Sequence, residues 1–214
     1  MRRIVSILCT ACVVGFIPIL AIADDCFECV LGIWDDEALT ATQGTILPGE
    51  PKEVFVGVKL REDIESISGV EFSIAGVDDG DLLLIGAVPL GPRALVWGLA
   101  PAPPDTTDTS AQVGGVTIAY SQCVPSHQAL MKLTLYTTHD LTDKVLVVKR
   151  SYPSTNPNFH TPVFMACDGP YFTMTRLSGG CFVLNPSGNA TDCLHPNVVA
   201  VEQETWGGVK NLFR

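Results

Sequence analysis

Residues Val54–Ala75 read VFVGVKLREDIESISGVEFSIA. Apolar side chains recur at every second position along Val54–Leu60 and again along Val70–Ile74. A period of two is typical of a half-buried strand, because successive side chains leave opposite faces. A polar link that ends in Gly69 separates the two runs. Two such strands are not stable alone, so their apolar faces predict a β-sandwich in which a second sheet covers them.

The segments on both sides of this stretch continue the pattern of short strands and turns. Residues 38–47 are predicted to form a strand that ends in the turn LPGEP. The continuous apolar run LLLIGAVPL at 82–90 predicts a fully covered strand. Further strands are predicted at 94–98, 115–123, 129–138, 144–150, 162–167, 170–177 and 180–184, and helical periodicity is lacking before residue 200. We therefore predict an all-β fold, an antiparallel jelly-roll sandwich of about ten strands.

The N-terminus has the pattern of a secretory signal. Arg2 and Arg3 precede an apolar run that ends in Ala21-Ile22-Ala23, which predicts cleavage after Ala23. A membrane anchor is the alternative, since a span needs ~20 apolar residues. The acidic pair that follows, in place of a Lys/Arg cluster, disfavours the anchor. The predicted organisation is a signal peptide (1–23), an N-terminal acidic segment with Trp34 as its anchor (24–37), the β-sandwich (38–201) and a C-terminal tail (202–214).

The tail differs in character from the rest of the chain. Thr205 can cap a short helix that brings Trp206, Val209 and either Leu212 or Phe213 to one side. Gly207 and Gly208 weaken such a helix by ~1 kcal/mol each relative to alanine. We therefore expect a short C-terminal helix that docks on the sandwich or serves as a sorting element.

The charge excludes two classes of partner. Loss of residues 1–23 removes two arginines, which leaves 11 basic against 23 acidic residues and a net charge of −12. Nucleic acids are bound mainly through neutralised phosphates, and anionic membranes through basic clusters. The mature chain is therefore predicted to bind neither, and its acidic charge is explained by solubility.

Six cysteines remain after cleavage, and an even number in an exported chain predicts disulfides. Six cysteines allow 15 pairings. Our hypothesis pairs Cys181 with Cys193 and Cys123 with Cys167, and leaves Cys26 and Cys29 as a local CxxC. The CxxC is interpreted as a structural or free pair, because a redox CxxC normally opens a helix in a βαβ unit.

No catalytic motif is found in the sequence. GxSxG, HExxH and a phosphate-binding glycine loop are all missing. His127, His139, His160 and His195 are widely spread and are interpreted as surface residues, so no metal or cofactor is predicted. Asp78, Asp79 and Asp81 supply calcium-like oxygens but lack EF-hand spacing, which leaves calcium binding open and favours an ordinary acidic turn. We predict that the chain is not an enzyme.

Three aromatic residues are candidates for stacking against a sugar ligand: Trp97, Tyr171 and Phe172. Core packing explains each of them equally well.

The segments EVFVGVKLREDIESISGVEFSI and GGVTIAY…ALMKLTLYT resemble the cohesin-type and carbohydrate-binding-module-type jelly-roll sandwiches of exported bacterial proteins. In those families a valine-rich strand is followed by a G-x-E-F-x-I strand, which here is Gly69–Ile74. In the second half of the chain, NPNFHTPVFMACDGPYFTMTRLSGGCFVLN and the terminal VEQETWGGVKNLFR are similar to a recurring ending of uncharacterised exported proteins of environmental bacteria, which implies no known activity. Cohesins bind dockerin modules through a sheet face, so the resemblance implies non-catalytic binding, although it transfers no contact residue.

We therefore expect an exported binding module whose partner is a protein or a polysaccharide, located outside the cell, at the cell surface or in the periplasm. The alternative is a structural envelope component that uses its C-terminal tail for docking or sorting. A hydrolase is the third and least favoured hypothesis.

Overall fold

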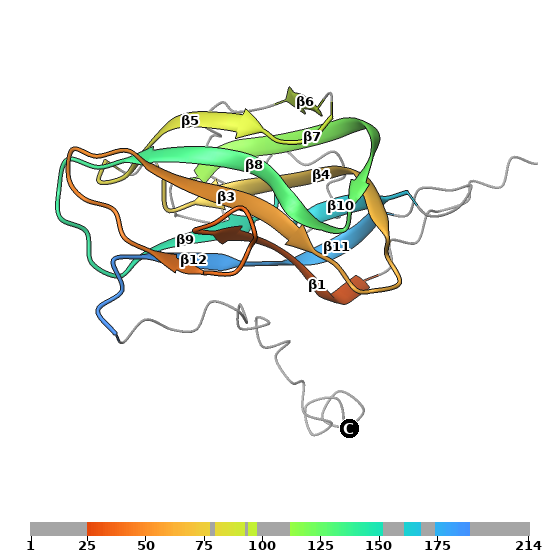
Figure 1. The fold of residues 1–214 in the computed structure, drawn as a ribbon, viewed down its shortest axis with the longest axis horizontal. Coiled ribbons are helices and arrows are strands. Elements are labelled where there is room, and N and C mark those ends of the chain that lie inside the picture. The colour runs from red at the N-terminus through yellow and green to blue at the C-terminus, as the bar shows by residue number, and fades with distance from the viewer. Residues whose placement is uncertain are drawn as a thin grey trace, which may run out of the picture.

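The computed structural model describes residues 25–77, 80–92, 94–97, 112–151, 161–167 and 174–188. Every regular element in these ranges is a β-strand (Figure 1). The strands are β1 (Asp25–Trp34), β2 (Gln43–Gly44), β3 (Lys52–Lys59), β4 (Ser66–Ala75), β5 (Leu83–Pro89), β6 (Ala94–Trp97), β7 (Gln112–Pro125), β8 (His127–Tyr136), β9 (Lys144–Lys149), β10 (Val163–Ala166), β11 (Met174–Gly179) and β12 (Cys181–Leu184). The prediction of an all-β fold is confirmed.

Hydrogen bonds connect these strands into one continuous sheet that folds over itself as two layers. The first layer has the order β5-β8-β3-β1, and its strands pair antiparallel (Figure 1). The second layer contains β6, β7, β4, β9 and β12 in that order, with the two-residue β2 at its edge. β10 and β11 join the layers, since β10 pairs with β4 and β11 runs parallel to β1.

The two runs that decide the fold are both strands, β3 and β4, but they do not pair with each other. β3 lies between β1 and β8 in the first layer, whereas β4 pairs with β7, β9 and β10. The six-residue link 60–65 crosses from one layer to the other, and a turn closed by the Ile64 N–H to the Arg61 carbonyl (3.0 Å) shapes it. The alternating side chains of the two strands therefore face each other across the sandwich.

Those inward side chains form the main core. Val54, Val56 and Val58 of β3, and Phe72 and Ile74 of β4, are at most 1% exposed. Aliphatic residues of β8 and β9 and two further phenylalanines, Phe164 and Phe182, belong to the same cluster. Burial of aliphatic and aromatic side chains contributes about 1.5–3 kcal/mol each, so this cluster is the main source of stability.

Gly180 marks the place where the chain changes layers between β11 and β12. Its N–H donates to the Leu31 carbonyl (2.8 Å), while its own carbonyl accepts from Val148 of β9 (2.9 Å). A Cβ at this position would lie 2.7 Å from the Cα of Gly32. The close approach requires glycine at position 180, and this connection fastens β1 to β9.

Two disulfides lie in the described part of the chain, which confirms the prediction of disulfide bonding. Cys123, in β7, is joined to Cys167, just after β10, with their Cα atoms 6.2 Å apart. Cys26 is joined to Cys29 within β1. Cys181 is also disulfide-bonded; Cys193, its proposed partner, lies outside the described residues.

Three predicted segments differ from the structure. Residues 25–34, assigned to an acidic N-terminal segment, form β1, which is a full member of the first layer. Within 38–47, predicted as one strand, only Gln43–Gly44 is strand, because side-chain hydrogen bonds hold residues 36–41 in a turn. The run 82–90 is a strand but not a covered one, since β5 is the last strand of its layer. The predicted helix in the tail 202–214 lies outside the described residues.

Candidate functional site

The first layer exposes a row of aliphatic side chains on its outer face. Six large apolar residues are exposed among the described residues, and three of them lie on β5. Leu83, Ile85 and Val88 are 42%, 54% and 51% exposed. We call these three residues the open strip. Isolated apolar residues on a surface need no explanation, but three on one short strand form a patch.

The backbone of β5 explains why all three point outward. Leu84 and Ala87 pack against the main core, so their neighbours Leu83 and Val88 face solvent. The register with β8 shifts between Leu84 and Gly86, which leaves Ile85 as the extra residue of a β-bulge. A bulge reverses the alternation locally. Leu83 and Ile85 share a face by ordinary alternation, and the bulge shifts the alternation by one residue so that Val88, and not Ala87, lies on the same face.

The neighbours of the open strip on β8 are amphipathic. Tyr136 lies opposite Leu83, and Lys132 lies opposite Val88. The Lys132 ammonium is 2.7 Å from the Glu53 carboxylate. This ion pair links β8 to β3, the next strand of the layer. This ion pair is partly exposed and contributes little to stability. It forms a charged border along one side of an apolar surface.

A second apolar cluster lies on the same outer face, but the protein covers it. Trp34, Leu39 and Ala129 are 8% exposed or less, and Val30, Phe55 and Leu90 pack against them. We call these six residues the closed cluster. Leu39 fills the space above Gly57, where a Cβ would lie 2.6 Å from a Leu39 methyl carbon. The outer face therefore has a closed half, under the 35–41 turn, and an open half along β5.

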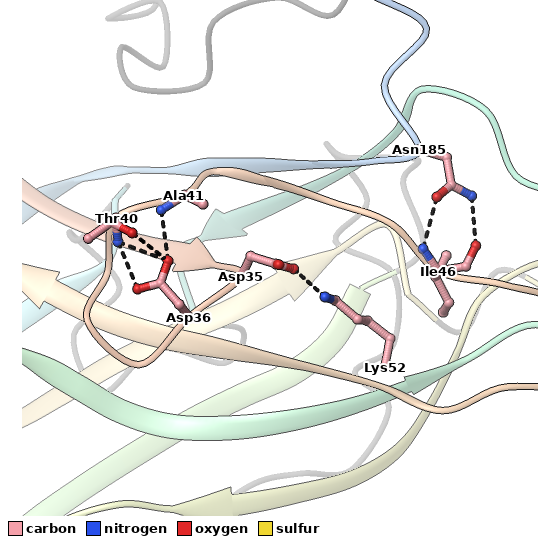
Figure 2. Close-up of polar contacts among 7 residues, drawn as sticks. All are labelled: Asp35, Asp36, Thr40, Ala41, Ile46, Lys52 and Asn185. Atoms are coloured by element: carbon pink, nitrogen blue, oxygen red, sulfur yellow. Dashed lines mark hydrogen bonds and ion pairs between the residues drawn. The ribbon is translucent and has the colours of Figure 1, made fainter.

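Asp36 holds the 35–41 turn, which contains Leu39, through the hydrogen bonds drawn in Figure 2. Its carboxylate accepts hydrogen bonds from the Thr40 hydroxyl (2.8 Å), the Thr40 N–H (3.1 Å) and the Ala41 N–H (3.0 Å). Leu39 has a φ of 59°, a conformation that is uncommon outside glycine, asparagine and aspartate. The hydrogen bonds to Asp36 offset the cost of this conformation.

We expect the stabilisation by Asp36 to depend on pH. Burial raises the pKa of Asp36, but the hydrogen bonds from Thr40, Ala41 and Ala38 together lower it below 3.8. A lowered folded-state pKa gives stability that is present above the unfolded pKa and is lost as pH falls through the folded value. Asp36→Asn should therefore cost about 1 kcal/mol at pH 7, and the difference from the wild type should shrink below about pH 4.

Urea unfolding between pH 2.5 and 7 measures this difference. Glu37→Gln is the control, because Glu37 is an exposed neighbour in the same turn. A constant difference at all pH values would mean that the Asp36 charge has no role in the turn.

Figure 2 also shows two contacts that hold the segments around the 35–41 turn in place. The Lys52 ammonium lies 2.6 Å from the Asp35 carboxylate, which links β3 to the start of the turn. Asn185 receives the Ile46 N–H (2.8 Å) and donates to the carbonyls of Ile46 (2.9 Å) and Leu141 (3.0 Å). These contacts join segments that are far apart in the sequence, and they are structural.

A small cavity of about 50 Å³ lies beside Trp34. Its lining includes Gly32, Thr42 and Lys59, and the Lys59 ammonium is 5.6 Å from the centre of the Trp34 ring system. Ligand pockets usually measure about 300–1,000 Å³. This cavity is too small for a sugar ring or a large peptide side chain, so it is not the candidate site.

Most of the residues predicted as ligand contacts lie outside the described residues, so their grouping stays a prediction. Trp97 is the last residue of β6, in the second layer. Tyr171, Phe172 and the tail residues Trp206, Val209, Leu212 and Phe213 lie outside the described residues, as do Asp78 and Asp79. His127 and His139 are exposed, and the described ranges contain no group of three or more His, Cys, Asp or Glu that could hold a metal ion. The same ranges contain no helix long and apolar enough to cross a membrane.

Periodicity alone does not reveal the open strip, although all three of its residues are in the run LLLIGAVPL. A continuous apolar run does not reveal which face lacks a partner, because the neighbours of a strand are set by the whole topology. Pro89 was the available signal, since proline in a strand favours an edge position.

No protein-family model and no curated protein matches this sequence. Solved cohesin modules are similar in structure. One, from a family 33 glycoside hydrolase of Clostridium perfringens, has 13% identity and a TM-score of 0.43 over 73% of this chain and 98% of its own. A non-cellulosomal cohesin of Archaeoglobus fulgidus has 10% identity and a TM-score of 0.44 over 73% and 90%. A cohesin from a type I cohesin–dockerin complex of Clostridium thermocellum has 10% identity and a TM-score of 0.44 over 77% and 96%.

Proposed function

We propose that this chain is an exported, non-catalytic β-sandwich module that binds a protein partner through the outer face of β5 and β8. The observation that carries the proposal is the open strip, where Leu83, Ile85 and Val88 expose 42–54% of their surface on one edge strand. Exposed apolar patches with a polar border are typical of protein-binding surfaces. The Lys132–Glu53 ion pair supplies such a border.

A protein partner fits this surface better than a polysaccharide does. Sugar rings are usually bound by aromatic side chains, whose faces stack on the C–H groups of the ring. The open strip is aliphatic, and Tyr136, which lies opposite Leu83, is half-buried. Aliphatic side chains gain most from an apolar surface that excludes water. The complementary surface is therefore an aliphatic or aromatic patch on another protein.

Export is part of the proposal. Its support is the signal-like N-terminus, followed at once by β1, which begins at Asp25, two residues after the expected cleavage site. The disulfides Cys26–Cys29 and Cys123–Cys167 add support, because such bonds persist in oxidising compartments. Mass spectrometry of the mature protein should find an N-terminus at Asp24.

A substitution in the open strip should abolish partner binding without unfolding the domain. Ile85→Asp places a charge at the centre of the patch, and truncations at such central positions typically cost 2 kcal/mol or more, which weakens binding about 30-fold. Leu95→Asp is the matched control: Leu95 is equally apolar and 60% exposed, but it lies on β6 in the other layer. Circular dichroism checks that both variants fold.

Immobilised wild-type protein and the two variants are each incubated with an extract of the producing organism. A protein retained by the wild type and by Leu95→Asp, but lost with Ile85→Asp, supports the proposal once its binding is reproduced with purified components. Retention of the same proteins by all three forms contradicts it. Binding on a glycan array that survives Ile85→Asp would instead favour a polysaccharide ligand at another face.

A further inference from the structure

The open strip lies near the point where the described chain ends. Asn185 contacts Ile46 and Leu141. Nearby, the Gly49 N–H donates to the Thr137 carbonyl (2.8 Å), and the Thr137 hydroxyl donates to the Asp81 carbonyl (2.8 Å). Asp81 is two residues before β5. These contacts bring the end of β12 and the start of β5 to the same end of the sandwich, on the left of Figure 1.

Twenty-six residues follow Gly188, and they are long enough to reach the whole of β5. The 18 residues from 188 to 206 can extend up to about 60 Å at ~3.3 Å per residue. By the same measure, the seven residues of β5 span about 23 Å. The last nine residues, 206–214, can therefore reach the open strip of their own chain.

The composition of residues 206–214 is complementary to this surface. They read WGGVKNLFR, with four large apolar residues, two basic residues and no acidic residue. Residues 25–188 carry 19 acidic and 9 basic side chains, a net charge of −10. A basic apolar segment tethered to an acidic domain with an exposed apolar strip has both an electrostatic and a hydrophobic reason to bind it.

We propose that residues 206–214 occupy the open strip of the same chain and so compete with the external partner. This inference rests on the proposed function only for the existence of the external protein partner. The contact between the tail and β5 is a separate claim. Apolar side chains of the tail cover Leu83, Ile85 and Val88, and the net negative charge of residues 25–188 attracts Lys210 and Arg214. The partner must then displace a segment whose effective concentration is millimolar, as expected for a short tether.

Hydrogen exchange of the intact mature protein tests the contact. The double substitution Trp206→Asp/Phe213→Asp should release the tail and speed amide exchange in Leu83–Pro89 about tenfold, as expected for a contact with a Kd of about 0.1 mM at millimolar effective concentration. Gly207→Ala is the control within the tail, because it keeps every apolar side chain. Exchange in Ala94–Trp97 should not change in either variant.

The reciprocal experiment uses substitutions on the sandwich. Ile85→Asp should raise the exchange of residues 206–214 by a similar factor, while Leu95→Asp should leave it unchanged. Unaltered amide exchange of β5 in the tail variant overturns the proposal. The proposal also fails if the protein has a dimeric mass and if dilution removes both the dimer and the protection of β5, because the tail would then bind a second copy.

The two proposals fail separately. If the tail protects β5 but no partner depends on Ile85, the proposed function fails and the tail contact stands. If a partner depends on Ile85 but the tail substitutions leave both β5 exchange and partner affinity unchanged, the tail contact fails.

Discussion

Phe72→Ala is expected to lower the free energy of unfolding by about 3–5 kcal/mol, the usual cost of removing a buried phenylalanine ring. Phe72 is fully buried at the centre of β4, where it lies opposite Val116 of β7 and belongs to the main core. Strands from both layers surround this side chain, so the cavity cannot close by the movement of one loop. A loss of this size is a large part of the 5–15 kcal/mol that stabilises a typical domain.

Phe55→Ala provides the matched control. Phe55 lies on β3 with its side chain on the outer face, where it is half-buried against the closed cluster. The same chemical change should cost only about 1–2 kcal/mol there, because less apolar surface returns to water. Urea unfolding measures both, and the m-value should remain constant. Equal losses for the two phenylalanines would contradict the assignment of Phe72 to the inner face.

The contrast between these two phenylalanines also shows what the sequence can predict. Alternation with a period of two predicts strands at Val54–Leu60 and Val70–Ile74, and the structure has β3 and β4 at these positions. Periodicity is a local property, and it predicts which side chains share a face. It does not predict that the two strands lie in opposite layers, because pairing depends on segments as distant as β8 and β10.

The missed strand β1 has a different explanation. Leu31 and Ile33 face the core, but Val30 and Trp34 on the other side are also apolar because they belong to the closed cluster. A strand with apolar residues on both faces loses its alternation. Acidic residues surround this strand, and the signal-like run directly precedes it. Both features favour the interpretation of residues 24–37 as a segment outside the β-sandwich. Trp34 was predicted as an anchor, and the structure buries it to 2% exposure.

The candidate site was hidden for the same reason. The run 82–90 is apolar at nearly every position, which predicts a strand covered on both sides. β5 is instead an edge strand whose outer side chains have no neighbouring layer among the described residues. An apolar face that the domain does not cover is what a binding surface requires. The disagreement between composition and topology therefore points to β5 as the candidate site.

Removal of the Cys123–Cys167 disulfide is expected to cost about 4 kcal/mol. The bond closes a loop with a sequence separation of 44 residues, and the chain-entropy relation for a loop of that length gives about 4 kcal/mol at 25 °C. Cys123 is exposed and Cys167 is half-buried, so the double substitution Cys123→Ala/Cys167→Ala removes little packing. The loss should therefore come almost entirely from the greater freedom of the unfolded chain.

Reduction of the protein separates the cross-link from the side chains. In the presence of a strong reductant the wild type also lacks the bond, so its stability should fall to that of the double variant. The difference between the two proteins in urea unfolding should then decrease from about 4 kcal/mol to less than about 1 kcal/mol. A difference that persists under reduction would assign the effect to the packing of Cys123 and Cys167 and would contradict the loop-closure explanation. The position of the bond explains its importance: it fastens β7 to the residue after β10, and β10 is one of the two strands that join the layers.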